Sequence, residues 1–193
     1  MNPTHAKHYT KAQKTAIGAL GIAAVFVSTR ILQFPIPLGY AHLGNVVILL
    51  FASFFGPQTG AVSGGLGSAL ADLTSFPAWT LPTLIIKTVM GLIAGFLCAG
   101  PRTGGPGKRS LLSTGSVIRI AAGAILAVLE MVFGYFLAGS ILYGSIETGA
   151  TQLPGLLLEG AVAIVLFLPL RQVLVKAARQ GHDLLGNSSR SHR

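Results

Sequence analysis

Five ionisable side chains lie inside or at the edges of long apolar segments, and these are Arg30, Asp72, Lys87, Glu130 and Glu159. A charged group in lipid is costly unless it is paired or hydrated, so each of them is a candidate for function. Counted along the apolar segments, all five fall in the half of the membrane that faces the outside. This shared depth predicts a polar cavity that opens outward.

The loops on the same side add aromatic rings and hydrogen-bonding groups. A small heteroaromatic ligand needs rings for stacking and a few polar groups that fix its orientation. We expect Lys87 to be the central group, paired with Glu130 or Glu159 when the site is empty. The expected substrate-binding residues are Tyr40, His42, Asn45, Asp72, Trp79, Thr83, Lys87, Glu130 and Glu159.

A structural interpretation of the same residues stays open. Lys87 would then neutralise Glu130 or Glu159 as a buried pair, and Asp72 would end its helix at the interface. Interfacial aromatic residues are also common in membrane proteins without any ligand. A lone histidine such as His42 is more often a hydrogen-bond partner than a metal ligand.

The residues that enzymes need do not occur in a matching pattern. The sequence has no HExxH motif and no paired-carboxylate spacing, so metal-assisted hydrolysis is unsupported. The run Gly65-Leu66-Gly67 lacks the third glycine of a dinucleotide fingerprint, and no strand precedes it. We therefore expect no catalytic residue, no metal and no cofactor, and a protein that is not an enzyme.

Composition explains where these side chains must reside. The chain has 193 residues, of which 51% are hydrophobic and 10% are charged, whereas a soluble domain is about 25% charged. High hydrophobicity excludes disorder, and a single cysteine excludes a disulfide scaffold. The basic residues lie at the ends of apolar runs, which argues against nucleic-acid binding despite the net charge of +9. The composition predicts a multi-pass protein of the cell membrane.

Six apolar segments are candidates for membrane helices. The second and third are short, because Gly56-Pro57 interrupts a longer apolar run. Segments 34–40, 75–82 and 139–152 are expected to be irregular links, and 100–110 a flexible connector. We predict an all-α, six-helix transmembrane bundle in residues 1–180, followed by a polar tail in 181–193 that is expected to be disordered. The six segments are 15–34, 43–55, 58–73, 82–99, 113–137 and 153–173.

Charge asymmetry predicts the orientation. Eleven of the 14 basic residues precede the first segment, fill the fourth connector or follow the sixth segment, and the opposite loops hold none. By the positive-inside rule, both termini are predicted to be cytoplasmic. Small residues four positions apart, as in Gly60 and Gly64 or Gly91 and Gly95, predict close helix packing. The pair Ala12 and Ala16 begins at the cytoplasmic edge, where a partner could dock.

Four sequence runs resemble the S components of energy-coupling factor (ECF) vitamin transporters. The blocks LGSALADL and LPTLIIK are the most specific part, and they look most like the branch associated with hydroxymethylpyrimidine or pyridoxine uptake. Two positions depart from the pattern: Asn45 stands where relatives often have aspartate, and Glu159 where glutamine or asparagine is expected. The four runs are residues 39–45, 55–61, 64–73 and 79–87.

The resemblance implies that the chain binds a vitamin or precursor from outside and hydrolyses nothing itself. It implies a membrane coupling protein and two cytoplasmic ATPases as partners, with Ala12 and Ala16 facing the coupling protein. It also implies that the loop containing residues 35–40 gates the pocket. A standalone proton-coupled secondary transporter that uses Glu130 or Glu159 as its proton site is the alternative, and a purely structural membrane scaffold is another.

Overall fold

The computed structural model describes residues 10–31, 33–36, 38–99 and 114–188. Within these residues, six helices of 12 residues or more account for most of the chain, which agrees with the six predicted segments. They are α1 (Lys11–Ile31), α2 (Gly44–Phe55), α3 (Pro57–Ser75), α4 (Thr80–Cys98), α5 (Thr114–Leu142) and α7 (Leu153–Ser188).

The first link is a short β-hairpin, whereas an irregular link was expected there. Strands β1 (Gln33–Ile36) and β2 (Gly39–His42) pair antiparallel, with Pro35 opposite Tyr40. The prolines in this segment exclude a helix, but they leave extended backbone free to pair across a tight turn. Leu38 in that turn has a φ of 62°, a left-handed conformation that is uncommon for residues other than glycine.

The other two links are also more regular than expected. A short 3₁₀ helix, η1 (Pro77–Trp79), leads directly into α4, which begins at Thr80. Pro82 lies in the first turn of that helix, where proline is tolerated because its nitrogen needs no partner.

Between α5 and α7 the chain forms a short helix, α6 (Ile146–Ala150). Helix α5 continues past residue 137 and ends before Gly144, whose φ of 68° is a conformation that favours glycine. At the other end of the molecule, α7 continues to Ser188, whereas a disordered tail was expected from residue 181. The basic connector around Arg102, Lys108 and Arg109, and the final residues 189–193, lie outside the described residues.

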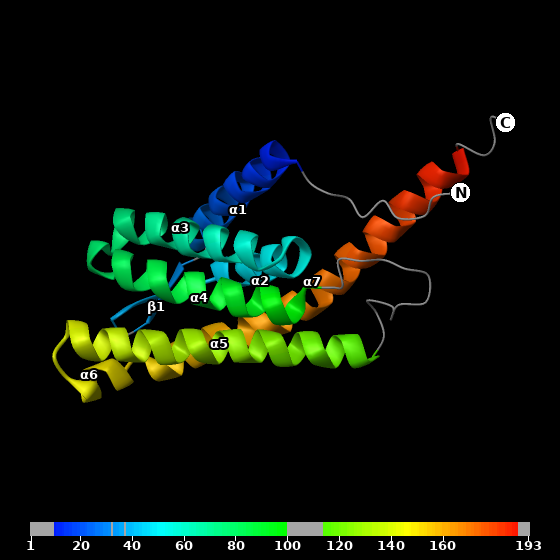
Figure 1. The fold of residues 1–193 in the computed structure, drawn as a ribbon. Coiled ribbons are helices and arrows are strands. Elements are labelled where there is room, and N and C mark those ends of the chain that lie inside the picture. The colour runs from blue at the N-terminus through cyan, green and yellow to red at the C-terminus, as the bar shows by residue number, and fades with distance from the viewer. Residues whose placement is uncertain (1–9, 32, 37, 100–113, 189–193) are drawn as a thin grey trace.

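The hairpin, η1 and α6 gather at one end of the bundle, which we call the hairpin end (Figure 1). Helices α3, α4 and α5 lie side by side, and α7 packs on α2 and α5 before it extends beyond the bundle. The predicted close approach of α3 and α4 is confirmed: a Cβ added at Gly60 would lie 2.6 Å from the carbonyl oxygen of Gly91. Glycine at both positions therefore lets the two backbones touch.

The core and the surface have the character of a membrane protein. Buried apolar residues from α2, α4, α5 and α7 form one cluster that includes Leu49, Met90, Met131 and Phe167. Large apolar side chains also cover the outside, for example Phe96 at 68% exposed, which suits contact with lipid and not with water. In the described residues, four helices are long and apolar enough to cross a membrane by length and composition, and α2 is shorter.

Candidate functional site

A cavity lies at the hairpin end, between the hairpin and the ends of α3, α4, α5 and α7. It holds about 410 Å³ of empty space, which includes open solvent. Its walls combine ionisable, aromatic and apolar side chains. They are Ile36, Leu38, Tyr40, His42, Asp72, Phe76, Trp79, Thr83, Lys87, Tyr135, Gln152, Leu156 and Glu159.

Three of the five ionisable residues singled out in the sequence meet at this cavity. Asp72 lies near the C-terminal end of α3, Glu159 near the start of α7, and Lys87 about 10 Å along α4 from its first residue. All three are buried, and the Lys87 side chain has no exposed surface. Helices α3, α4 and α7 thus place two carboxylates and one ammonium around one space.

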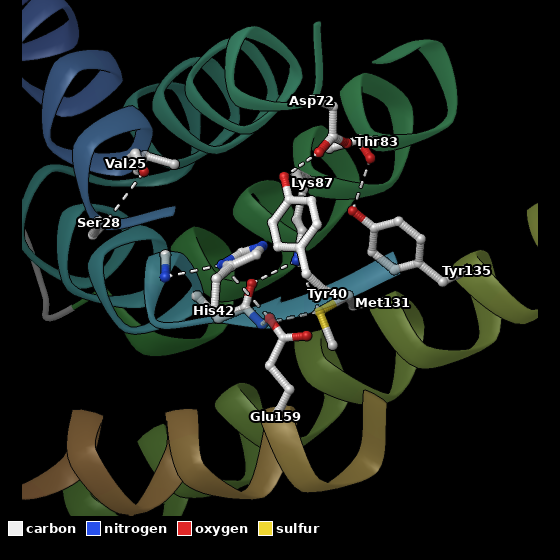
Figure 2. Close-up of polar contacts among 12 residues, drawn as sticks. Val25, Ser28, Tyr40, His42, Asp72, Thr83, Lys87, Met131, Tyr135 and Glu159 are labelled. Atoms are coloured by element: carbon white, nitrogen blue, oxygen red, sulfur yellow. Dashed lines mark hydrogen bonds and ion pairs between the residues drawn. The ribbon is translucent and has the colours of Figure 1, made fainter. Parts of the chain in front are cut away.

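Lys87 is held by neutral groups at the base of the cavity (Figure 2). Its Nζ donates to Oδ1 of Asn45 at 2.6 Å, contacts Sδ of Met131 at 3.0 Å and lies 5.1 Å from the centroid of the Tyr135 ring. The amide nitrogen of Asn45 in turn donates to Oε1 of Glu159 at 2.7 Å. Asn45 therefore connects the ammonium to the carboxylate through its amide.

The expected direct pair of Lys87 with Glu130 or Glu159 was wrong. Within the described residues, no carboxylate oxygen lies within ion-pair distance of Lys87, because the Asn45 amide occupies the space beside Glu159. An ammonium has three N–H donors, and the two contacts with Asn45 and Met131 use two of them. The third N–H is available to an acceptor in the cavity.

A second chain of hydrogen bonds crosses the mouth of the cavity. The Tyr40 hydroxyl on β2 donates to Oδ1 of Asp72. The hydroxyls of Thr83 and Tyr135 lie 3.0 Å apart and form a hydrogen bond in which either can be the donor. Burial, together with the Asp72 carboxylate, raises the pKa of Tyr40 above its ordinary value, so the phenol keeps the proton that joins the hairpin to α3.

His42 is neutral and fixed in one tautomer. Burial first, and then the positive charge of Lys87, hold the pKa of His42 well below its ordinary value. Its Nδ1 accepts the backbone N–H of Gly44 at 3.0 Å, so the ring proton resides on Nε2. The 3.6 Å approach of Nδ1 to Oε1 of Glu159 is therefore a polar contact and not an ion pair.

Aromatic rings form the wall near the hairpin end. The centroids of Trp79 and Tyr135 lie 5.7 Å apart, and those of Tyr40 and Phe76 lie 5.2 Å apart. Both pairs are tilted, in the distance range of favourable ring contacts. These rings offer apolar faces to a planar ligand.

The structure separates the other predicted residues from the cavity. Asn45 is close behind Lys87 without lining the space, and Glu130 is half-buried on α5, with Oε2 buried and without a hydrogen-bond partner. Arg30 is exposed at the end of α1. Ala12 and Ala16 are exposed on α1, on the part of that helix far from the hairpin.

Sequence reasoning missed Met131, Tyr135 and Gln152. Met131 and Tyr135 are four residues apart on α5 and so share a face of that helix. Glu130 is one residue before Met131, so its side chain points in a different direction around the helix axis. Their pattern is the ordinary one of a buried helix face, which carries no sign of a ligand. Gln152 lies just before α7, where a polar residue normally reaches solvent, but its side chain is buried.

The donor set does not suggest a metal centre. Within the described part of the chain, no group of three or more histidine, cysteine or acidic side chains is arranged to hold a metal ion. The cavity instead combines one ammonium, two carboxylates and several neutral donors. Such a mixture suits a small polar molecule with both donors and acceptors.

Comparison with known proteins identifies the family. The chain is 39% identical over 123 residues to an uncharacterized protein of Pyrococcus woesei, which covers 63% of this chain and 74% of that protein. It is 30% identical over 139 residues to the thiamine precursor transporter HmpT of Lactococcus lactis subsp. cremoris (strain MG1363), which covers 68% of this chain and 70% of that protein. The profile of the family described as ECF-type riboflavin transporter, S component, matches residues 9–176. The chain is a multi-pass protein of the cell membrane and belongs to the S-component family of ECF-type transporters.

Proposed function

We propose that this chain captures a small aminopyrimidine, of the class of the hydroxymethylpyrimidine precursor of thiamine, from outside the cell. The observation that carries the proposal is the cavity in which Asp72, Lys87 and Glu159 meet below an aromatic wall. The similarity to a thiamine precursor transporter supports the same class of ligand. The chain then serves as the binding subunit of an importer and not as an enzyme.

The chemistry of the cavity matches the polar edge of an aminopyrimidine. A carboxylate accepts hydrogen bonds only, so Glu159 or Asp72 pairs with the exocyclic amino group. The free N–H of Lys87 pairs with a ring nitrogen, which is an acceptor. The planar ring then lies against Trp79 or Tyr135, whose faces are apolar.

The size of the charged cluster favours a single ring. Asp72, Lys87 and Glu159 surround one space, and a small ring with several polar atoms can reach all three. A tricyclic flavin needs a longer apolar slot for its ring system. Riboflavin is the second candidate because the matching family is described as riboflavin transporters, and Lys87 could donate to a flavin carbonyl.

The orientation follows from the charge distribution along the chain. Basic residues concentrate around the start of α1 and in the C-terminal half of α7, which by the positive-inside rule belong to the cytoplasm. The hairpin end then faces outside, and the cavity opens toward the external solute. The two termini lie on the cytoplasmic side.

Delivery into the cell requires partners. We assign to this chain a membrane coupling protein and two cytoplasmic ATPases, in keeping with its family. Ala12 and Ala16 are exposed on α1, and small exposed residues four apart allow another helix to approach closely. They are the contact that we propose for the coupling protein.

Ligand binding by the purified protein tests the proposal. The protein in lipid nanodiscs is titrated with 4-amino-5-hydroxymethyl-2-methylpyrimidine, pyridoxine, thiamine and riboflavin, and small molecules that copurify are identified by mass spectrometry. We expect the aminopyrimidine to bind at least tenfold more tightly than the others, which is about 1.4 kcal/mol. Tighter binding of riboflavin would replace the proposed ligand with the second candidate. Binding of none of the four would end the proposal.

A transport experiment separates the importer from a standalone secondary transporter. The chain is reconstituted in proteoliposomes alone and together with a coupling protein and ATPase pair. We expect uptake only with the complete set and ATP. Uptake by the chain alone that follows a proton gradient, and that an uncoupler abolishes, would favour the alternative.

A further inference from the structure

Two buried N–H donors beside the cavity find no hydrogen-bond partner among the described residues. They are Nε1 of Trp79 and Nε2 of Gln152. The two side chains are 5% and 3% exposed, and both line the cavity. A buried donor without an acceptor destabilises the protein, so two of them beside one cavity call for an explanation.

The two side chains meet at one point of α5. A Cβ added at Gly139 would lie 3.4 Å from Cη2 of Trp79 and would overlap Nε2 of Gln152. Glycine at this position therefore makes room for the Gln152 amide, whereas Cη2 of Trp79 would be at ordinary contact distance from an added Cβ. Because an indole nitrogen can only donate, the group that satisfies Trp79 must be an acceptor.

Rigid elements fix the position of each donor. The backbone N–H of Gln152 donates to the Gly149 carbonyl at 3.3 Å, and its own carbonyl accepts from Leu156 at 3.0 Å, so α6 and α7 hold it from both sides. The ring of Trp79 lies between Tyr135 and Tyr143, with centroids at 5.7 and 6.3 Å. Donors on packed elements keep their geometry before a ligand arrives.

We propose that Trp79 and Gln152 form a subsite of two hydrogen-bond donors that binds the hydroxyl oxygen of the ligand. In this subsite the indole N–H and the amide N–H both donate to that oxygen, which makes Gln152 a specificity-determining residue. The assignment rests on the proposed function, because it takes the ligand to be an aminopyrimidine that carries an alcohol. The carboxylates hold the amino edge of the ring, and the donor pair reads the substituent.

A matched pair of ligands tests the subsite. The probes are 4-amino-5-hydroxymethyl-2-methylpyrimidine and 4-amino-2,5-dimethylpyrimidine, which lacks only the hydroxyl. Dissociation constants are measured by calorimetry in nanodiscs for the wild type, Gln152→Met and Trp79→Phe. Gln172→Met is the control, because Gln172 lies on α7 and does not line the cavity.

We expect the wild type and the control to prefer the hydroxymethyl compound by about tenfold, and each variant to reduce that preference to threefold or less. Binding of the dimethyl compound should stay within about twofold in the wild type, the control and Gln152→Met, which also shows that these proteins are folded. Trp79→Phe also changes the surface against which the ring packs, so it is judged only by the ratio of the two dissociation constants. Variants that keep the wild-type preference while the pyrimidines still bind would overturn the subsite alone. A wild type that binds neither pyrimidine would refute the proposed function, and the subsite with it.

Discussion

Replacement of Lys87 by methionine should weaken binding of the aminopyrimidine by a predictable amount. Of the three N–H donors of the ammonium, Asn45 and Met131 occupy two, so the ligand gains one charge-assisted hydrogen bond. Such a bond contributes about 1.5–3 kcal/mol, which corresponds to about 10- to 150-fold in Kd. Methionine is also unbranched and is one heavy atom shorter than lysine, and it lacks the donors and the charge.

The same substitution should change stability little. Loss of the ammonium leaves Oδ1 of Asn45 without a partner, which costs about 1–3 kcal/mol. Removal of a buried cation from apolar surroundings offsets that cost, because its desolvation penalty disappears. The apparent Tm of Lys87→Met is therefore expected to remain within a few degrees of the wild-type value.

Calorimetric titration in nanodiscs, together with thermal unfolding of the same samples, measures both quantities. Lys176→Met is the control, because Lys176 is exposed on α7 and does not line the cavity. A folded Lys87→Met protein that binds the pyrimidine within about twofold of the wild type would remove Lys87 from the site. It would leave the ammonium as a structural group held by Asn45.

Two further predictions concern packing and pH. Gly91→Ala should destabilise the protein by about 1–3 kcal/mol, since the added Cβ would overlap the backbone of Gly60. Gly18→Ala is the control, because its added Cβ meets no atom within 4 Å and should not destabilise the protein. Equal Tm values for the two variants would contradict the α3–α4 contact. Because His42 has a pKa below its unfolded value of 6.5, the unfolded chain binds more protons, and stability should fall as pH drops below about 6.5, by at most about 1.4 kcal/mol per pH unit from this residue. The apparent Tm of His42→Gln between pH 7.5 and 5.5 should accordingly fall less than that of the wild type, and parallel curves would argue against a buried neutral imidazole.

Hydrophobic runs and their interruptions were sufficient to predict the long helices. A segment of apolar residues must pair its backbone internally in lipid, so helix is the outcome wherever no proline or glycine intervenes. Gly56-Pro57 ended one helix and began the next as expected, and the small residues of α3 and α4 predicted their contact. The hairpin and α6 were missed, because short extended or helical pieces in a link depend on contacts that no local pattern records.

The cost of charge in lipid also pointed to Asp72, Lys87 and Glu159 as a group. The same argument selected Glu130, which the structure places away from the cavity, because one residue along a helix turns a side chain by about 100°. Counting residues along a segment predicts how deep in the membrane a side chain lies. The direction in which that side chain points around the helix axis depends on which neighbours pack on the helix.

The sequence by itself determined that this is a membrane protein of long helices, with costly polar groups near one face and basic residues near the other. These conclusions follow from the composition and from the order of residues along the chain, because the free energy of transferring a side chain into lipid depends on the type of that side chain. Only the tertiary structure decided that Asn45 separates Lys87 from Glu159, that Tyr40 joins the hairpin to Asp72, and that Gln152 is buried beside Trp79. These contacts join residues that are far apart in the chain, and helix rotation and packing alone bring their atoms within hydrogen-bonding distance.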